Sequence, residues 1–460
     1  MSIGAVVSVL LAGAYLASSW LGQRPFDWDG RGADNGSQRG FLDHRSARDA
    51  AVQEEIAGVR EKALAAAQRL VDQYPDSLDA ICVSGMIHSR YGDRAQAVQC
   101  WRRCVGVDPG FADACHCLGE DALQRGEFVE AIDWFERALE TETKAPAVQL
   151  SLGKALSRLG RMEEAIAAYG KHLEQAPESV EGCFQMAQAH MHLKQYAAAK
   201  KYHAAALHLD PHCKPAYFGL AMACDRLGQK QEAEKYRQEF ALREDKDRMP
   251  AEGRRAKYDD ADEMRKGLAD SYHSAAVVYA AHGDLPQAED HWKKALAVRP
   301  EHAESRLTLV AFYEHQERWD DAVSVLDQWT QIAPNQPLQY LKLGALHVKR
   351  QQLDAAEAAF RKAIELAPAR HEGHVALAQL CLYPGRDPAQ ARTAAETAVR
   401  LDPSAAHYFL LCLACGRCGD LAQAETAIQR ALELDPANPQ YRQTEAALRA
   451  KSTNSNRNPR

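Results

Sequence analysis

The same glycine-led phrase occurs twice in this chain, a whole number of 34-residue steps apart. The stretch GDLPQAEDHWKKALAVRP begins at Gly283, and GDLAQAETAIQRALELDP begins at Gly419, four full periods later. A period of this length constrains the fold more than any single motif, because each repeat is one small unit that buries its apolar side only against its neighbours. The chain is therefore expected to form an array of similar units and not two or three separate globular domains.

Three kinds of residue recur in phase with this period. A proline ends each phrase, a glycine stands about half a period earlier, and an alanine follows shortly after the glycine. Glycine tolerates the left-handed backbone that ends a helix, alanine lets two helices approach closely, and proline stops a helix. Each unit is therefore predicted to be a pair of antiparallel helices. The glycines that set the phase are Gly92, Gly126, Gly160, Gly283 and Gly419, and the aromatic residues at helical spacing are Trp101, Phe135, Tyr169, Trp292 and Phe360.

This pattern resembles the tetratricopeptide repeat (TPR) family, whose signature is a 34-residue helix–turn–helix. The resemblance implies an all-α, TPR-type α-solenoid, a right-handed superhelix of about ten to eleven helix-turn-helix repeats in two stacks. The matching residues are Leu118, Gly119, Ala131, Phe135 and Ala138 in the unit that begins at Ala112, and Tyr340, Leu343, Gly344, Ala356, Phe360, Ala363 and Pro368 in the unit that begins at Pro337.

The phase of the repeats divides most of the chain into two stacks. A first stack at 44–247 and a second at 269–438 are separated by a charged joint at 248–268, where the phase breaks. The first unit, 44–77, has a degenerate first helix and is expected to cap the array. Residues 439–460 are expected to form a capping helix followed by a disordered tail.

The N-terminal segment is apolar. Residues Ile3 to Leu21 are uncharged, and as a helix they are long enough to cross a bilayer core. Residues 1–22 are therefore predicted to be a transmembrane anchor or signal segment, and 23–43 a flexible tether. A cleaved signal peptide, a mis-assigned start and a buried helix remain alternatives.

Positive charge after this segment indicates an orientation. Arg24, Arg31 and Arg39 follow it, whereas no lysine or arginine precedes it. The positive-inside rule then predicts a single-pass, membrane-anchored protein with its repeats on the cytoplasmic side, and an exported or periplasmic location is the alternative.

Catalytic motifs are lacking in the sequence. No phosphate-binding glycine loop, HExxH or GxSxG motif occurs, and nearly every residue from 44 to 450 already has a place in a repeat. The chain is therefore expected not to be an enzyme and to have no catalytic residues, metal ligands or cofactor. The net charge of −7 and pI of about 6.2 give no basic field, so no nucleic-acid partner is expected.

A cluster of cysteines is the strongest candidate for a metal site. Cys412, Cys415 and Cys418 are spaced by three, as in some zinc and iron–sulfur proteins. On a helix this spacing turns the thiols progressively around the axis, so small buried packing residues are the preferred interpretation, and a metalloprotein remains a competing one.

The resemblance also implies a binding surface. In the TPR family the first helix of each repeat lines a concave groove, and fixed repeat positions point into it. Apolar residues and a recurring cation at the end of the first helix suit an extended, partly acidic peptide. The same cations would also be favoured at helix C-termini without any ligand. The predicted groove residues are Met86, Arg90, Leu150, Arg158, Phe184, Met191, Phe218, Met222, Arg226, Leu307, His315, Leu341, Lys349, Phe409 and Arg417.

Together these features predict a membrane-tethered TPR scaffold or adaptor that mediates protein–protein interactions, with a protein or an extended peptide as its ligand. The alternative function is an accessory subunit of an envelope-assembly or cytochrome-maturation machinery.

Overall fold

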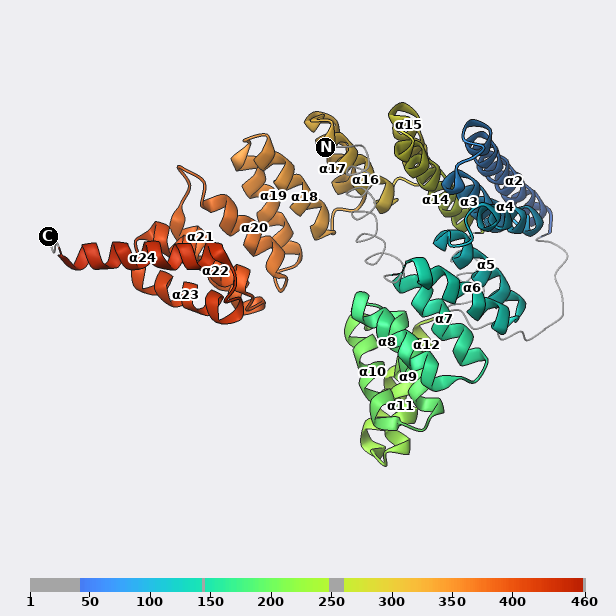
Figure 1. Ribbon diagram of the computed structural model, residues 1–460, viewed down its shortest axis with the longest axis horizontal. Helices are drawn as coiled ribbons and strands as arrows, with labels where there is room; N and C mark the ends of the chain where they lie inside the picture. Colours follow the sequence, from blue (N-terminus) through green and yellow to red (C-terminus); the bar gives the residue numbers. More distant parts are fainter. Residues whose placement is uncertain (1–41, 143–144, 248–259, 458–460) are drawn as a thin grey trace. The chain divides into compact units, whose positions relative to one another are not determined.

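The computed structural model describes residues 42–142, 145–247 and 260–457, and throughout these ranges the chain is all-α without a strand. Twenty of the helices form ten antiparallel hairpins (Figure 1). The first helices of the hairpins are α3 (Leu78–Arg90), α5 (Ala112–Arg125), α7 (Pro146–Arg158), α9 (Val180–His192), α11 (Lys214–Arg226), α14 (Asp260–Ala281), α16 (Ala303–His315), α18 (Pro337–Lys349), α20 (His371–Cys381) and α22 (Ala405–Cys418). The second helices are α4 (Arg94–Val107), α6 (Phe128–Thr141), α8 (Met162–Gln175), α10 (Tyr196–Leu209), α12 (Lys230–Asp247), α15 (Leu285–Val298), α17 (Trp319–Ile332), α19 (Leu353–Leu366), α21 (Pro388–Leu401) and α23 (Leu421–Leu434). Helix α2 (Leu42–Gln73) precedes the first hairpin, and α24 (Pro439–Arg457) follows the last. The predicted all-α solenoid of about ten repeats is confirmed.

The turn inside each hairpin contains one residue in the left-handed backbone conformation, and these residues keep the period of the sequence. All five glycines that set the phase have a positive φ. In three hairpins the same position is occupied by Lys194, Glu317 or Gln351, with φ of 59°, 56° and 59°. These side chains adopt a conformation that costs a residue with a Cβ about 1–2 kcal/mol. The turn is therefore imposed by the packing of the two helices, even where glycine is lacking.

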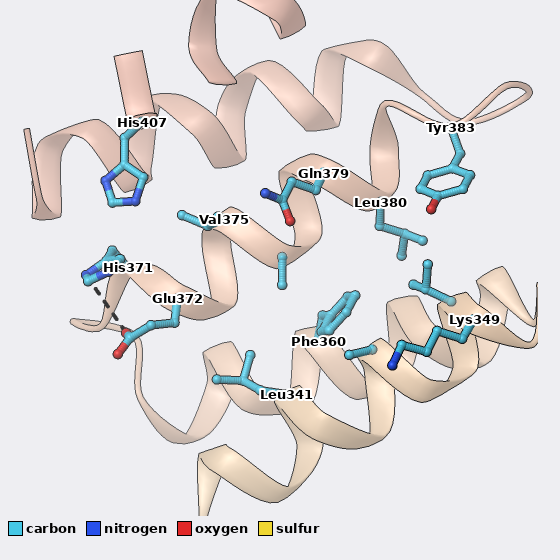
Figure 2. A pocket seen from close by; sticks show the side chains of 13 residues that line it. Leu341, Lys349, Phe360, His371, Glu372, Val375, Gln379, Leu380, Tyr383 and His407 are labelled. Carbon is cyan, nitrogen blue, oxygen red and sulfur yellow. Dashed lines mark ion pairs between the residues drawn. The ribbon is translucent and has the colours of Figure 1, made fainter. Parts of the chain in front are cut away.

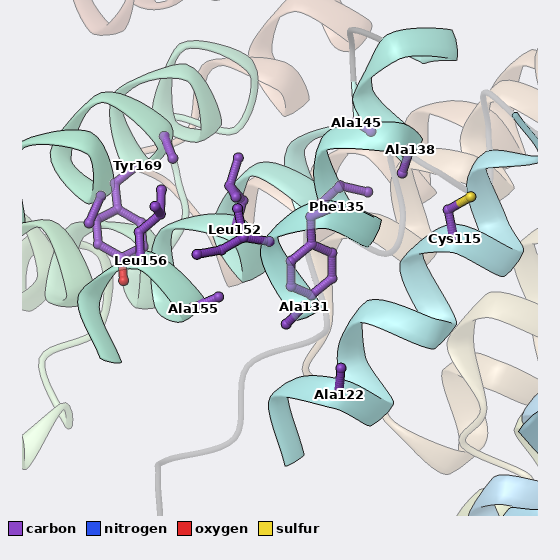
Figure 3. Close-up of a cluster of buried hydrophobic side chains, with 14 of the residues drawn as sticks. Cys115, Ala122, Ala131, Phe135, Ala138, Ala145, Leu152, Ala155, Leu156 and Tyr169 are labelled. Carbon is purple, nitrogen blue, oxygen red and sulfur yellow. The ribbon is translucent and has the colours of Figure 1, made fainter. Parts of the chain in front are cut away.

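A ring from the second helix fits against a glycine of the first helix in four of the hairpins. A Cβ atom added to Gly119 would lie 2.5 Å from Cε1 of Phe135, and Gly85, Gly153 and Gly344 stand in the same relation to Trp101, Tyr169 and Phe360. Phe135 and Tyr169 are fully buried, and both belong to one continuous hydrophobic cluster that joins successive hairpins (Figure 3). The aromatic residues predicted from the period are thus the centres of the repeat cores.

A histidine occupies this ring position in α10. His203 is fully buried, and neither ring nitrogen has a hydrogen-bond partner among the described residues. Burial lowers the pKa of His203 from 6.5 to about 4, because the charged imidazolium would lose its hydration. The imidazole therefore packs as a neutral ring.

Helix α14 returns to the beginning of the chain and packs against α2 and α3 (Figure 1). Leu268 of α14 is buried in one cluster with Val59 and Ala63 of α2, Ile87 of α3 and Tyr91, which directly follows α3. At the other end of α14 the ring of Tyr74 stacks on His282, with ring centroids 4.2 Å apart.

Polar contacts also join these segments. Arg265 Nε donates to Glu55 Oε1 at 2.7 Å, Gln73 Nε2 donates to Asp284 Oδ2 at 2.9 Å, and Arg90 forms an ion pair with Asp270. Helix α14 therefore fills, beside α2, the place that a first helix would take in the opening repeat.

The first repeat unit, predicted at residues 44–77 with a degenerate first helix, does not form two helices in the structure. Residues Leu42–Gln73 form one continuous helix of 32 residues. Gly58 stands one full period before Gly92 but lies inside this helix and does not have the positive φ of the other phase glycines. Because α14 already covers α2, a separate first helix from residues 44–77 has no surface left to bury.

The chain groups into two compact units, one that ends at Leu307 and one that begins at Thr308. We describe each unit by itself. The boundaries placed from the sequence at 247/248, 268/269 and 438/439 stay predictions.

The predicted membrane localisation requires correction. None of the helices in the described part of the chain is sufficiently long and apolar to cross a bilayer. The segment that prompted the prediction, residues 1–22, lies outside the described residues, as does nearly all of the tether at 23–43. The prediction of a single-pass anchor with repeats on one side of a membrane is therefore contradicted for the described chain.

The left-handed turns generate a first prediction. Lys194→Gly should raise the free energy of unfolding by about 1 kcal/mol, because glycine adopts the positive φ without a steric cost. Urea denaturation of the full chain measures this change. The matched control is Lys171→Gly, an exposed lysine inside α8, which should lower stability by about 1 kcal/mol. If both substitutions lower the free energy of unfolding equally, the left-handed backbone at Lys194 does not cost stability, and the prediction is wrong.

The glycine–ring contact generates a second prediction. Gly119→Ala should cost about 1–3 kcal/mol, because the buried Phe135 ring has no room to move away from the new methyl group. Gly106→Ala in α4 is the control, since its added Cβ meets nothing within 4 Å, and it should leave stability unchanged or raise it. In a double-mutant cycle, Phe135→Leu should recover part of the loss caused by Gly119→Ala. Strictly additive losses would show that the two residues are not coupled.

The buried histidine generates a third prediction. In the unfolded chain His203 takes up a proton near pH 6.5, whereas in the folded chain it does so only near pH 4. The unfolded state therefore binds more protons between these values, and the free energy of unfolding falls as the pH is lowered through this window. His203→Leu should make this fall smaller by about 1–3 kcal/mol, measured by urea denaturation at pH 7 and pH 4.5. His208→Leu, an exposed histidine of the same helix, should leave the pH dependence as in the unmodified chain.

Candidate peptide-binding groove

A pocket of about 530 Å³ lies in the second unit, along the first helices of three consecutive hairpins. Helices α18 and α20 supply most of its lining, while α22 contributes His407, α19 contributes Phe360 and the turn after α20 contributes Tyr383. First helices of successive repeats lie side by side, so the pocket follows the direction in which the repeats are stacked. An extended chain laid along it would cross one repeat after another.

The lining of the pocket is mostly apolar, with polar side chains at two ends and the amide of Gln379 between Val375 and Leu380 (Figure 2). Its apolar lining includes Leu341 and Val375 together with the buried side chains of Phe360 and Leu380. Figure 2 shows the imidazoles of His371 and His407 at one end and Tyr383 with Lys349 at the other. An apolar floor with polar groups at fixed positions is typical of sites that bind a segment of defined orientation.

Charges at the pocket are partly balanced by neighbouring side chains. Lys349 Nζ lies 3.2 Å from Glu314 Oε1. Burial alone would raise the pKa of Glu372, but the hydrogen bond and the positive charge of Arg370 outweigh this and hold the pKa below its usual value. Glu372 is therefore ionised at neutral pH.

All fifteen residues predicted for the groove lie on first helices, and each has an exposed or half-exposed side chain. Phe218, Met86 and Met222 are the most exposed apolar members, at 53%, 42% and 39% of their surface. The pocket brings together only Leu341 and Lys349 from this set. The remaining thirteen lie on α3, α7, α9, α11, α16 and α22, and their contact with a ligand stays a prediction.

The predicted cations fall into two groups. Arg90 is paired with Asp270 of α14 and Lys349 with Glu314, so packing inside the protein already uses both charges. Arg158, Arg226 and Arg417 are exposed, and no carboxylate among the described residues forms an ion pair with them. Only this second group has its charge available for a ligand.

Sequence reasoning missed several lining residues. Val375 stands one period after Leu341 and one period before Phe409, so the repeat already pointed to it, and Gln379 follows Ala345 by the same step. His371 and His407 have no such signal, because they occupy different positions in their repeats and meet only through the packing of α20 beside α22.

The cysteine cluster has the packing role preferred from its spacing. Cys412 and Cys415 are buried, and burial raises the pKa of Cys412 to about 12 and that of Cys415 to about 11. Cys415 Sγ donates to Gln423 Oε1 at 3.2 Å, while Cys418 Sγ donates to the carbonyl oxygen of Pro388 at 3.2 Å. The thiols thus point to separate partners, and all twelve cysteines are free.

Comparison with known structures gives several similar repeat proteins. The structure of MamA is 18% identical, with a TM-score of 0.34, and the match covers 35% of this chain and 95% of that one. The Cut9–Hcn1 hetero-tetramer of APC/C is 12% identical with a TM-score of 0.33, covering 83% and 92%. YrrB, described as a TPR protein with an unusual peptide-binding site, is 19% identical with a TM-score of 0.30, covering 45% and 97%. Comparison with curated proteins gave no match.

Four family models, each described as a tetratricopeptide repeat, match the sequence. Two of them match in more than one place. The matched residues are 122–189 and 279–346 for the first model, 84–147, 184–246 and 382–439 for the second, 340–370 for the third and 50–77 for the fourth. Together these matches span most of the ten hairpins, and the chain belongs to the tetratricopeptide repeat family.

Proposed function

We propose that this chain is a scaffold that binds an extended segment of another protein along its first helices. The observation that carries the proposal is the pocket of α18, α20 and α22, whose apolar floor lies open along consecutive repeats. A helical hairpin array can present such a floor without a catalytic centre, and the TPR fold is typically a scaffold. We therefore propose a non-enzymatic role.

The chemistry of the pocket describes the segment that would fit. Leu341, Val375 and Phe360 offer contact to two or three apolar side chains, and each buried aliphatic group would contribute about 1–2 kcal/mol. Beyond the pocket, Arg417 is exposed on α22 and has no ion pair within the described chain. A segment that combines apolar residues with a nearby acidic residue matches both features.

We extend the proposal to exposed apolar side chains of the other unit, which lie on two separate first helices: Met86 on α3, and Phe218 with Met222 on α11. Methionine adapts its shape to different partners, and exposed apolar side chains on first helices suit adaptable binding. The accessory-subunit alternative depended on the N-terminal segment, and no contact of the described residues favours it.

Selection from a displayed random-peptide library against the full chain tests the proposed site. Selected peptides should combine apolar and acidic residues, and Val375→Asp should weaken their binding at least tenfold, because a carboxylate would replace part of the apolar floor. Fluorescence polarisation with a labelled selected peptide measures the dissociation constant.

The matched control is Ala358→Asp, which adds the same charge at an exposed position of α19 outside the pocket. It should leave the dissociation constant unchanged. If both variants bind the selected peptides as tightly as the unmodified chain, the pocket is not the binding site. Circular dichroism checks that Val375→Asp remains folded.

A further inference from the structure

Three side chains with metal-binding atoms meet where α20, α21 and α22 come together. His371 is the first residue of α20, Asp402 directly follows α21, and His407 lies in the first turn of α22. One nitrogen or oxygen atom from each lies within 4.8 Å of those of the other two, and the two imidazole rings are 4.9 Å apart between centroids. We propose that these residues bind a divalent transition-metal ion of the zinc type.

In the metal-free protein the carboxylate of Asp402 and the imidazole of His407 are already as far apart as two ligand atoms of one ion. Asp402 Oδ2 lies 3.2 Å from His407 Nδ1. Two ligands of a tetrahedral zinc ion, each about 2 Å from the metal, are separated by about 3.3 Å. His407 is largely buried, and in the metal-free protein its Nδ1 donates to the carbonyl oxygen of Asp402 at 2.8 Å, a hydrogen bond that the ion would replace. Binding of the ion at Nδ1 would release the proton that this nitrogen holds in the metal-free protein.

His371 completes the set from the neighbouring repeat. Its Nδ1 lies 3.9 Å from Glu372 Oε2, so this nitrogen faces a carboxylate and leaves Nε2 as the ligand atom (Figure 2). At 3.9 Å the carboxylate is near the ring without a hydrogen bond to it, and Arg370 Nη2 donates to the same carboxylate at Oε1, at 2.5 Å. The side chain of His371 is 37% exposed, so it is free to make the small rotation that brings it to bonding distance. Two imidazoles and one carboxylate suit zinc and similar ions.

The charges around this cluster distinguish it from a second one. Asp270, His302 and Glu304 also place ligand atoms within 4.8 Å of one another. There, however, Arg90 forms an ion pair with Asp270, and His302 Nε2 lies 3.0 Å and 3.2 Å from the two carboxylates. That cluster is already balanced by a guanidinium group, which would repel a divalent ion. No lysine or arginine in the described part of the chain pairs with Asp402, and the guanidinium group of Arg370 beside His371 pairs with Glu372, which is not one of the three ligands.

The proposed ion would join two repeats beside the pocket. His371 and His407 both line the pocket, and they belong to the first helices of adjacent hairpins. Three protein ligands leave the fourth position of a tetrahedral ion for a water molecule. Bound metal would therefore hold α20 against α22 and fix the width of this end of the pocket.

Titration of the metal-free full chain with ZnCl2 by isothermal calorimetry, in a buffer that holds free zinc in the micromolar range, tests the proposal. One ion per chain should bind. His371→Gln and Asp402→Asn should each weaken this binding at least tenfold, while thermal unfolding without metal stays close to that of the unmodified chain. The control is His374→Gln, one turn further along α20, whose Nε2 faces the carbonyl oxygen of Pro368 at 3.3 Å. It should bind zinc normally.

The absorption spectrum of the Co2+ form identifies the ligands independently. Two histidines and a carboxylate should give the visible bands of four-coordinate Co2+ without a thiolate charge-transfer band. A thiolate band would assign the ion to cysteines and overturn the proposal. It is also overturned if the unmodified chain binds no zinc, or if His371→Gln and Asp402→Asn bind it as tightly as the unmodified chain does.

Discussion

The fold depends on the contact between a small residue of the first helix and a large one of the second. Gly119 with Phe135 and Gly153 with Tyr169 allow two helices to approach until a ring fills the space between them. The ring then reaches the next hairpin, so the same contact that closes one repeat also stacks it on its neighbour. Because no single hairpin can bury its own ring completely, the array is stable only as an array.

Most of this arrangement could be predicted from the sequence because it is local and periodic. The spacing of glycine, alanine and aromatic residues identified the hairpins, and even the left-handed turns at Lys194 and Gln351 fall on the predicted phase. The packing of α14 on α2 could not be predicted, because residues such as Tyr74 and His282 lie far apart in the sequence and carry no periodic signal. Because the sequence does not show that α14 packs on α2, it indicated two helices at residues 44–77, where the structure has the single helix α2.

The candidate site was predictable to the extent that it follows the period. Leu341 and Lys349 were identified, and Val375 occupies the same repeat position as Leu341. The imidazoles of His371 and His407 were not found, since their meeting depends on how two repeats are turned relative to each other. The sequence also could not show which cations are already paired within the protein. Only the structure shows that Arg90 forms an ion pair with Asp270. A repeat pattern thus locates a surface but not the charges left available on it.

The return of α14 to the N-terminal helix has a consequence for biosynthesis. Leu268 and Tyr91 belong to one buried cluster, yet the ribosome adds Tyr91 long before it reaches Leu268. During translation α3 can cover its part of α2 early, whereas the part of α2 that packs on α14 stays uncovered while the hairpins from α3 to α12 are made. Chains generally fold as they are synthesised, at about 5–20 residues per second, so this exposure lasts on the order of ten seconds or more. The contact of α2 with α14 is therefore one of the last contacts of this first helix that can form during synthesis.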